Sequence, residues 1–97
     1  MADQHLMKPV VIKIEQIYVP AALRKPLDPR KLEEIAVSIA DIGQQSPILV
    51  RPDKARPSGE RPSEERYVLV SGLHRLEACR ALGEATIIAN LVQARKH

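Results

Sequence analysis

The pattern of apolar and polar residues along the chain predicts six elements of secondary structure. Short aliphatic or β-branched runs bounded by turn residues are typical of strands. They occur at residues 10–14, 47–51, 67–70 and 86–92, and residues 17–19 either extend the first strand or restart it. Apolar residues recur at helical spacing over 29–42 and 73–82. The predicted order is therefore strand, helix, strand, strand, helix, strand.

The first helix has the clearest boundaries. Asp28 can cap free backbone amides and Pro29 is tolerated at the first helical position, so the helix is expected to begin here. Gly43 is a typical residue to end it. Its predicted apolar face consists of Leu32, Ile35, Ala36, Ile39 and Ile42.

The second helix follows an abrupt end of the preceding strand at Ser71 and Gly72. Gly83 is the expected terminator of this helix. Its apolar arc is predicted to contain Leu76, Cys79 and Leu82. The single cysteine, Cys79, is therefore expected to pack in the core and not to react.

Residues 52–66 separate the second and third predicted strands. They contain three prolines, two serines and a glycine, with charges of alternating sign and almost no apolar residue. This composition predicts a mobile, solvated hairpin loop, in preference to a binding segment.

Length and composition limit the chain to one α/β domain over residues 1–97, with a core at about 10–93. The 97 residues are 44% hydrophobic and 28% charged, as in an average soluble globular domain. No apolar run approaches the roughly 20 residues that cross a bilayer, so a cytoplasmic location without membrane contact is the simplest expectation.

The three histidines, His5, His74 and His97, are scattered, which argues against a metal site. A net charge of +3 suits an anionic ligand but is low for a DNA-coating protein.

The segment from Tyr67 to Arg80 carries the most informative candidate chemistry. If Gly72 opens the second helix, a phosphate can approach its backbone, where the first-turn amides, His74 and Arg75 converge. On spacing alone an ordinary turn with a solvated arginine remains the alternative. A second basic cluster lies at the start of the first helix and consists of Arg24, Lys25, Arg30 and Lys31. Its side chains either face the same ligand or are solvent-exposed residues of an ordinary helix turn.

These motifs together resemble the N-terminal domain of ParB partition proteins over most of the chain. The resemblance rests on Arg24-Lys25, Leu27-Asp28, Leu32, Ile35-Ala36, Ser38-Ile39, Gly43, Pro47-Ile48, Val50-Arg51-Pro52, Tyr67 to Gly72, Arg75 and Ala78. The wider ParB/sulfiredoxin superfamily also contains the free serine kinases. The resemblance implies a small mixed sheet with two main helices and a nucleotide bound by Gly72, Leu73, His74 and Arg75.

Each branch of the superfamily implies something different for this chain. ParB proteins typically have Gly-Glu-Arg-Arg where this chain has Gly72 to Arg75, and they continue into a DNA-reading domain, so at most non-specific DNA binding is expected. Sulfiredoxins have Gly-Cys-His-Arg, and similarity to them implies nucleotide contacts from Lys31 and Ser38. Because Leu73 occupies the position of their catalytic cysteine, sulfiredoxin activity is not expected.

The resemblance thus predicts a module that binds a nucleoside triphosphate, CTP or ATP with Mg²⁺, with help from Lys31, Ser38 and Arg24. Its expected role is accessory to partition, plasmid or mobile-element regulation, with a protein partner or a second copy as further possible contacts and weak NTP hydrolysis left open. One alternative is a small ATP-dependent phosphotransferase of the free serine kinase type, with Glu33 or Glu34 as its base. Another is an interaction domain whose nucleotide site has decayed. Without the resemblance, the same element order would also fit a ferredoxin-like sandwich.

Overall fold

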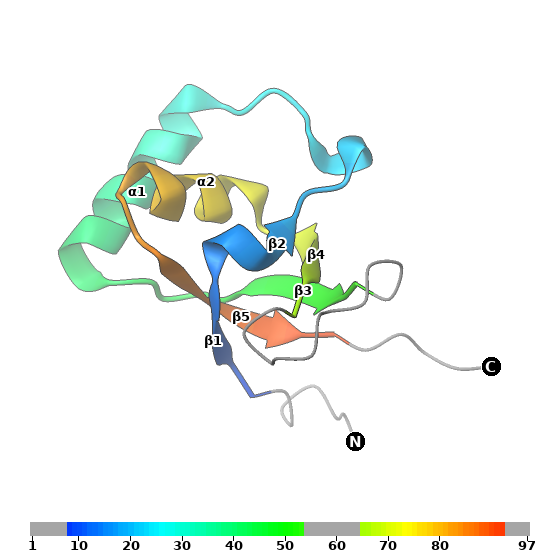
Figure 1. Ribbon diagram of the computed structural model, residues 1–97. Coiled ribbons are helices and arrows are strands. Elements are labelled where there is room, and N and C mark those ends of the chain that lie inside the picture. Colours follow the sequence, from blue (N-terminus) through cyan, green and yellow to red (C-terminus); the bar gives the residue numbers. More distant parts are fainter. Residues whose placement is uncertain (1–7, 54–64, 93–97) are drawn as a thin grey trace, which may run out of the picture.

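The computed structural model describes residues 8–53 and 65–92. It contains five strands and two α-helices, shown in Figure 1. The strands are β1 (Val10–Lys13), β2 (Ile17–Tyr18), β3 (Ile48–Pro52), β4 (Tyr67–Ser71) and β5 (Thr86–Leu91). The helices are α1 (Pro29–Ile42) and α2 (Leu73–Ala81), and two 3₁₀ turns, η2 (Ile14–Gln16) and η3 (Ala21–Leu23), flank β2.

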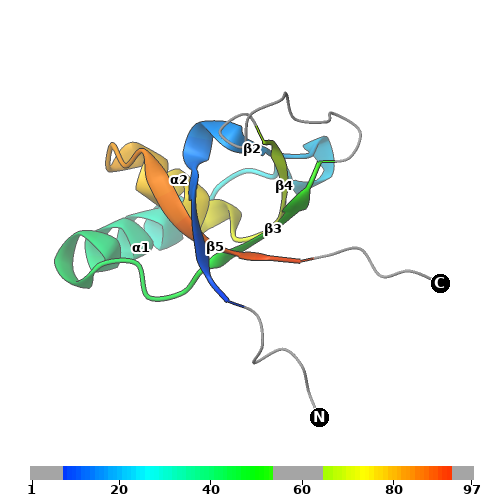
Figure 2. The ribbon, with the colours of Figure 1, turned by 60° about the horizontal axis from the view of Figure 1, so that its bottom comes forward.

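The strands form one mixed, curled sheet in the order β1-β5-β3-β4-β2. The pairs β1–β5 and β3–β4 are antiparallel, whereas β3–β5 and β2–β4 are parallel. Both helices lie on the same side of this sheet, with α2 between α1 and the strands (Figures 1 and 2). The predicted α/β class with two main helices is confirmed.

The first predicted strand is divided in two. Ile14, expected to end that strand, instead starts the 3₁₀ turn η2, and its side chain is buried. The chain then restarts as β2, whose Ile17 pairs with Tyr67 at the opposite edge of the sheet. Turning the chain at η2 lets Ile12, Ile14 and Ile17 all enter one core.

The core lies between α2 and the sheet. Its buried side chains are Ile12, Ile14, Ile17, Ile48, Val50, Leu69, Leu76, Cys79, Ile87 and Ala89. Cys79 is 2% exposed, which confirms its predicted place in the core. Burial of this aliphatic set is the main stabilising contribution available to so small a domain.

Helix α1 is docked less deeply than its sequence pattern suggests, because none of its residues is fully buried. Leu32, Ile35, Ala36 and Ile39 are half-buried, as expected for an apolar face packed mainly on α2. Ile42, predicted on the same face, is 59% exposed, and Leu82, predicted on the apolar arc of α2, is 38% exposed. Both predictions were wrong because each residue lies at the C-terminal end of its helix, where the chain turns away at the next glycine.

The predicted loop 52–66 falls mostly outside the described residues. Pro52 belongs to β3, and the Asp53 amide donates a hydrogen bond to the Arg66 carbonyl at 3.0 Å. The two ends of the segment are therefore paired across the β3–β4 ladder.

Candidate functional site

Gly72 forms the turn between β4 and α2. Its φ of 107° and ψ of 31° lie in the left-handed region, and it is the N-cap of α2. A Cβ atom here would approach Ile48 Cγ2 to 2.7 Å. Glycine is thus required both by the backbone conformation and by the packing of the turn on β3, in addition to any access it gives a ligand.

The turn presents the start of α2 to solvent and to α1. The Leu76 amide donates to the Gly72 carbonyl at 2.9 Å, which closes the first helical turn. The amides of Leu73, His74 and Arg75 precede this first intrahelical bond, so they have no acceptor within the helix. Such amides and the helix dipole favour an anion at this position.

His74 joins the starts of the two helices. Its Nε2 accepts a hydrogen bond from the Asp28 backbone amide at 3.0 Å. Asp28 in turn caps α1, because its Oδ1 accepts from the amides of Arg30 at 3.1 Å and Lys31 at 3.4 Å. An accepting Nε2 requires the neutral imidazole with its proton on Nδ1, so Nδ1 is the atom of His74 that can donate to a ligand.

Arg75 lies on the other side of the first turn of α2, against the middle of α1. It lines a cavity of about 150 Å³ between the two helices together with Glu34 and Ser38. We call this the interhelical cavity. It brings together Arg75 and Ser38 from the predicted nucleotide contacts and Glu34 from the predicted bases. Glu33 is exposed on α1 and does not line it.

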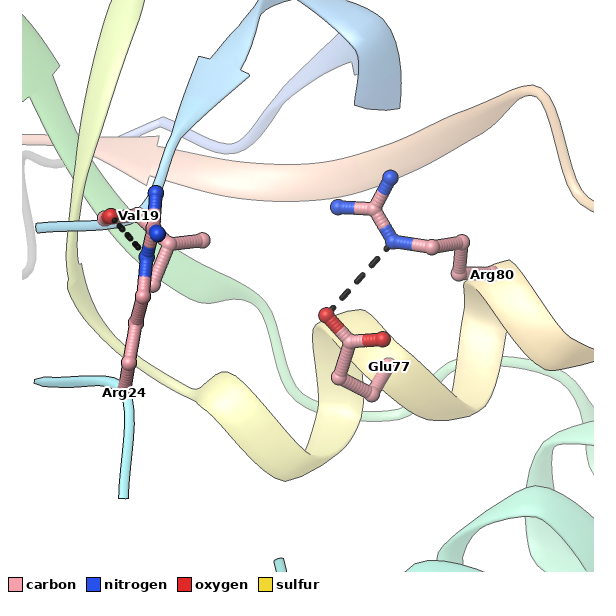
Figure 3. A network of polar contacts seen from close by, with 4 residues as sticks. All are labelled: Val19, Arg24, Glu77 and Arg80. Carbon is pink, nitrogen blue, oxygen red and sulfur yellow. Dashed lines mark hydrogen bonds and ion pairs between the residues drawn. The ribbon is translucent and has the colours of Figure 1, made fainter. Parts of the chain in front are cut away.

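A larger cleft of about 400 Å³ lies on the opposite face of α2, against β2 and the segment that follows it. We call this the α2–β2 cleft. Its apolar lining is Ile17, Val19, Leu27 and Leu73, and its charged lining is Arg24, Lys25, Glu77 and Arg80. The Arg24 Nε donates to the Val19 carbonyl at 2.9 Å, and its guanidinium lies 5.7 Å from the centre of the Tyr18 ring (Figure 3).

The structure therefore divides the predicted site residues among three places. Gly72 and His74 form the junction of the helix starts, Ser38 and Arg75 line the interhelical cavity, and Arg24 and Leu73 line the α2–β2 cleft. Lys31 is exposed on the first turn of α1 and lines neither space.

Two cleft residues, Glu77 and Arg80, were missed by the sequence analysis. They form an ion pair at 3.5 Å and lie four and seven residues after Leu73. That spacing places all three on one face of a helix, and it is the signal that could have identified them.

Two groups in the described part of the chain have a perturbed pKa. Burial raises the pKa of the Cys79 thiol, and Glu84 adds to this effect, whereas Arg75 opposes it. Burial also raises the pKa of Tyr67, as do the hydrogen bond from its hydroxyl to Glu65 at 2.9 Å and the charge of that carboxylate. The Cys79 thiol is thus buried, and its thiolate form is disfavoured.

Within residues 8–53 and 65–92, no group of three or more histidine, cysteine or carboxylate side chains is placed to hold a metal ion. No helix in the same part of the chain is long and apolar enough to cross a membrane.

The family model of the ParB N-terminal domain matches residues 2–97. The chain belongs to this family. No curated protein sequence gives a significant match.

Solved structures agree with the family assignment. Sulfiredoxin from Arabidopsis thaliana is 31% identical with a TM-score of 0.70, covering 90% of this chain and 86% of its own. ParB from Caulobacter crescentus complexed with CTP-gamma-S is 26% identical with a TM-score of 0.68, and the match covers 92% of this chain. The same ParB complexed to the centromeric parS site is 25% identical with a TM-score of 0.70 over 90% of this chain. The present chain corresponds to only 46% and 42% of these two ParB chains.

The family assignment confirms the predicted ParB/sulfiredoxin relationship. Leu73, the first residue of α2, occupies the position where the sequence comparison with sulfiredoxins expects a cysteine. The roles of the individual site residues remain predictions.

Proposed function

We propose that this ParB N-terminal domain binds a nucleoside triphosphate at the start of α2. The observation that carries the proposal is the turn at Gly72, where no side chain caps the first amides of α2, next to the capped start of α1. The similarity to a ParB that was solved in complex with CTP-gamma-S supports a nucleotide as the ligand.

In this proposal the phosphates accept hydrogen bonds from the amides of residues 73–75 and from His74 Nδ1. Arg75 supplies the nearest positive charge of α2, and Ser38 faces the same interhelical cavity, where its hydroxyl can bond to the nucleoside part. Lys31 adds a second charge from the first turn of α1. Arg24 lines the separate α2–β2 cleft and is not assigned to the nucleotide.

The family assignment supports a proposal for the biological role. We propose that the domain acts as a nucleotide-dependent accessory module in partition, plasmid or mobile-element regulation, with CTP or ATP and Mg²⁺ as its ligand. Any contact with DNA would be through phosphates and without sequence preference.

A phosphotransferase is a second candidate, favoured by one observation. Glu34 shares the interhelical cavity with Arg75, so a carboxylate and a phosphate-binding group face one space. Transfer would require Glu34 to take a proton from an acceptor hydroxyl as that oxygen bonds to the γ-phosphorus, while the bond to the bridging oxygen breaks and the nucleoside diphosphate leaves. ADP release from ATP that depends on an added alcohol and is lost in Glu34→Gln would support this function over simple binding.

The test of nucleotide binding is titration calorimetry with ATP, CTP and GTP, with and without Mg²⁺. Arg75→Gln should weaken binding by about 1.5–3 kcal/mol, because it removes a hydrogen bond to a charged group. Arg51→Gln is the matched control, since Arg51 is exposed on β3 and lines neither the interhelical cavity nor the α2–β2 cleft. Equal losses in both variants, or no binding of any nucleotide, would favour an interaction domain without a nucleotide site.

A further inference from the structure

A third cavity lies where both helices end. Its volume is about 250 Å³, and its lining is Val11, Ile39, Gly43, Gln44, Cys79, Glu84, Thr86, Ile87 and Ile88. We call this the helix-end cavity. Figures 1 and 2 show α1 and α2 ending on the same side of the molecule, away from the helix starts that Asp28 and His74 join. The helix-end cavity shares only Ile39 and Gly43 with the interhelical cavity, so it is a separate space from the proposed nucleotide site.

The floor of the helix-end cavity is apolar. Cys79 and Ile87 are each 2% exposed, and Ile39 and Ile88 are half-buried beside them. Val11 is 66% exposed, so its side chain is available to cover a ligand at the rim. Because the volume lies just below the roughly 300–1,000 Å³ of drug-sized sites, the cavity fits only a small apolar body.

Glu84 is the one charged residue of the lining. Within the described part of the chain its carboxylate forms no ion pair. The carboxylate acts on the floor of the cavity, because its charge adds to burial in raising the pKa of the Cys79 thiol. Arg75 lowers that pKa, but it lines the interhelical cavity and not this one. The lining thus carries an unpaired negative charge and no positive charge.

The ends of the helices add to this negative potential. The last carbonyls of a helix lack helical partners and carry the negative end of its dipole, which favours a cation. Helix α1 has no basic residue in its last turn. The last turn of α2 contains Arg80, but this residue is paired with Glu77 and lines the α2–β2 cleft. A cation in the helix-end cavity is therefore favoured by Glu84 and by both helix ends.

We propose that the helix-end cavity binds a small alkylammonium ion, the charged form of a primary amine with a short hydrocarbon chain. The hydrocarbon packs on Cys79 and Ile87 and is covered by Val11, while the ammonium group meets the Glu84 carboxylate at the rim. This site is independent of the proposed nucleotide site, because the two select ligands of opposite charge with different side chains.

The first experiment titrates the full chain with four-carbon probes at about pH 7, where an alkylamine is charged. Nuclear magnetic resonance follows the backbone amides and the side-chain amide of Gln44. n-Butylammonium should bind more tightly than n-butanol, which has the same chain without a charge, and more tightly than butyrate, which has the opposite charge. It should shift the signals of Gln44 and Ile87 and leave that of Gly72 in place. Equal binding of butylammonium and butanol, or shifts confined to Gly72, would overturn the proposal.

Chain length tests the apolar part of the site. From methylammonium to butylammonium each added methylene should tighten binding by up to about fourfold, because burying one methylene contributes about 0.8 kcal/mol. Affinity that does not rise with chain length would mean that the amine meets only a surface charge, and would refute the cavity. Lysine with both ends blocked distinguishes a free amine from a lysine side chain of a partner protein. If it binds more tightly than butylammonium, a free amine is not the ligand and the proposal fails.

Matched variants then locate the site. Glu84→Gln should weaken butylammonium binding about two- to fivefold, the effect of an exposed ion pair. Val11→Ala should weaken it through lost apolar contact. The controls are Glu33→Gln and Val37→Ala, because both residues are exposed on α1 and line neither this cavity nor the other two. Thermal melts establish that each variant is folded. Losses in the controls as large as those in Glu84→Gln and Val11→Ala would show that the amine does not bind in the helix-end cavity.

Discussion

At the scale of single residues, Gly72 and His74 determine where the start of α2 lies. Gly72 permits both the left-handed turn and the close approach to Ile48, and His74 ties the turn to the Asp28 amide. The side chains that would contact a ligand are therefore placed by two residues whose structural roles can be measured without any ligand.

Gly72→Ala should lower the free energy of unfolding by about 2–5 kcal/mol, because the left-handed conformation and the contact with Ile48 both resist a Cβ atom. Gly83→Ala is the matched control. Its φ is 79°, but among the described residues no atom beyond the adjacent ones in the chain lies within 4 Å of the added Cβ, so only the conformational cost of about 1–2 kcal/mol applies. Urea denaturation measures the free energy of unfolding of both variants. Equal losses would mean that the Ile48 side chain moves to accommodate the Cβ without a loss of stability.

At the scale of secondary structure, the side chain of Gln44 extends the hydrogen bonding along β5 ahead of the first residue of β3. Gln44 lies before β3, yet its amide nitrogen donates to the Ile88 carbonyl at 2.8 Å and its oxygen accepts from the Ile88 amide at 2.8 Å. This pair of bonds takes the place of one more ladder residue beside β5, because the first pair of β3 and β5 is Ile48 with Ala89. The same amide nitrogen also donates to the Ser46 carbonyl at 2.9 Å, which shapes the connection from α1.

Gln44→Ala should lower the free energy of unfolding by about 1–3 kcal/mol, since it leaves the partly buried polar groups of Ile88 without partners. The Ile88 amide should also exchange its hydrogen faster. Gln45→Ala serves as the control, because the side chain of Gln45 donates to the carbonyls of Ile42 and Gly43 in its own turn and, among the described residues, makes no bond to β5. An unchanged exchange rate at Ile88 in Gln44→Ala would show that solvent replaces the side chain.

Local pattern was enough to predict both helices and the strands β3, β4 and β5 to within about two residues. Apart from Ile42 and Leu82 at the helix ends, the apolar periods of these segments agree with the faces they bury, and the cap at Asp28 is formed as expected. The division of β1 from β2 was not decided by the sequence, because it depends on pairing Ile17 with Tyr67, a contact between distant segments. The role of Gln44 was missed for the same reason, since nothing local distinguishes its amide from that of Gln45.

At the scale of the whole molecule, the candidate site was predicted only in part. The start of α2 and its nearness to α1 follow from the order of elements and the Gly72 turn. The separation of Arg24 from Arg75 does not, because it depends on how the segment after β2 packs on the far face of α2. Basic residues that the family motifs assign to one ligand can thus line two different cavities of one small domain.

The long segment between β3 and β4 provides the last prediction, which concerns the stability of the molecule as a whole. Its ends already meet in the Asp53 to Arg66 hydrogen bond. The backbone carbonyl of Glu65 accepts from the Gln16 side chain at 2.8 Å, and its carboxylate accepts from the Tyr67 hydroxyl at 2.9 Å. Replacing residues 54–64 by Asn-Gly while keeping Glu65 leaves a three-residue hairpin loop of a common length.

The melting temperature of this shortened protein should stay within a few degrees of the original, because closure entropy depends only weakly on loop length. A second version that also replaces Glu65 by alanine is the control. It removes the Tyr67 hydroxyl's bond to the carboxylate and should melt slightly lower. Calorimetric melts compare the two versions with the full chain. A loss of stability in the first version as large as that of a core substitution, about 2–5 kcal/mol, would mean that residues 54–64 contribute to the packed structure.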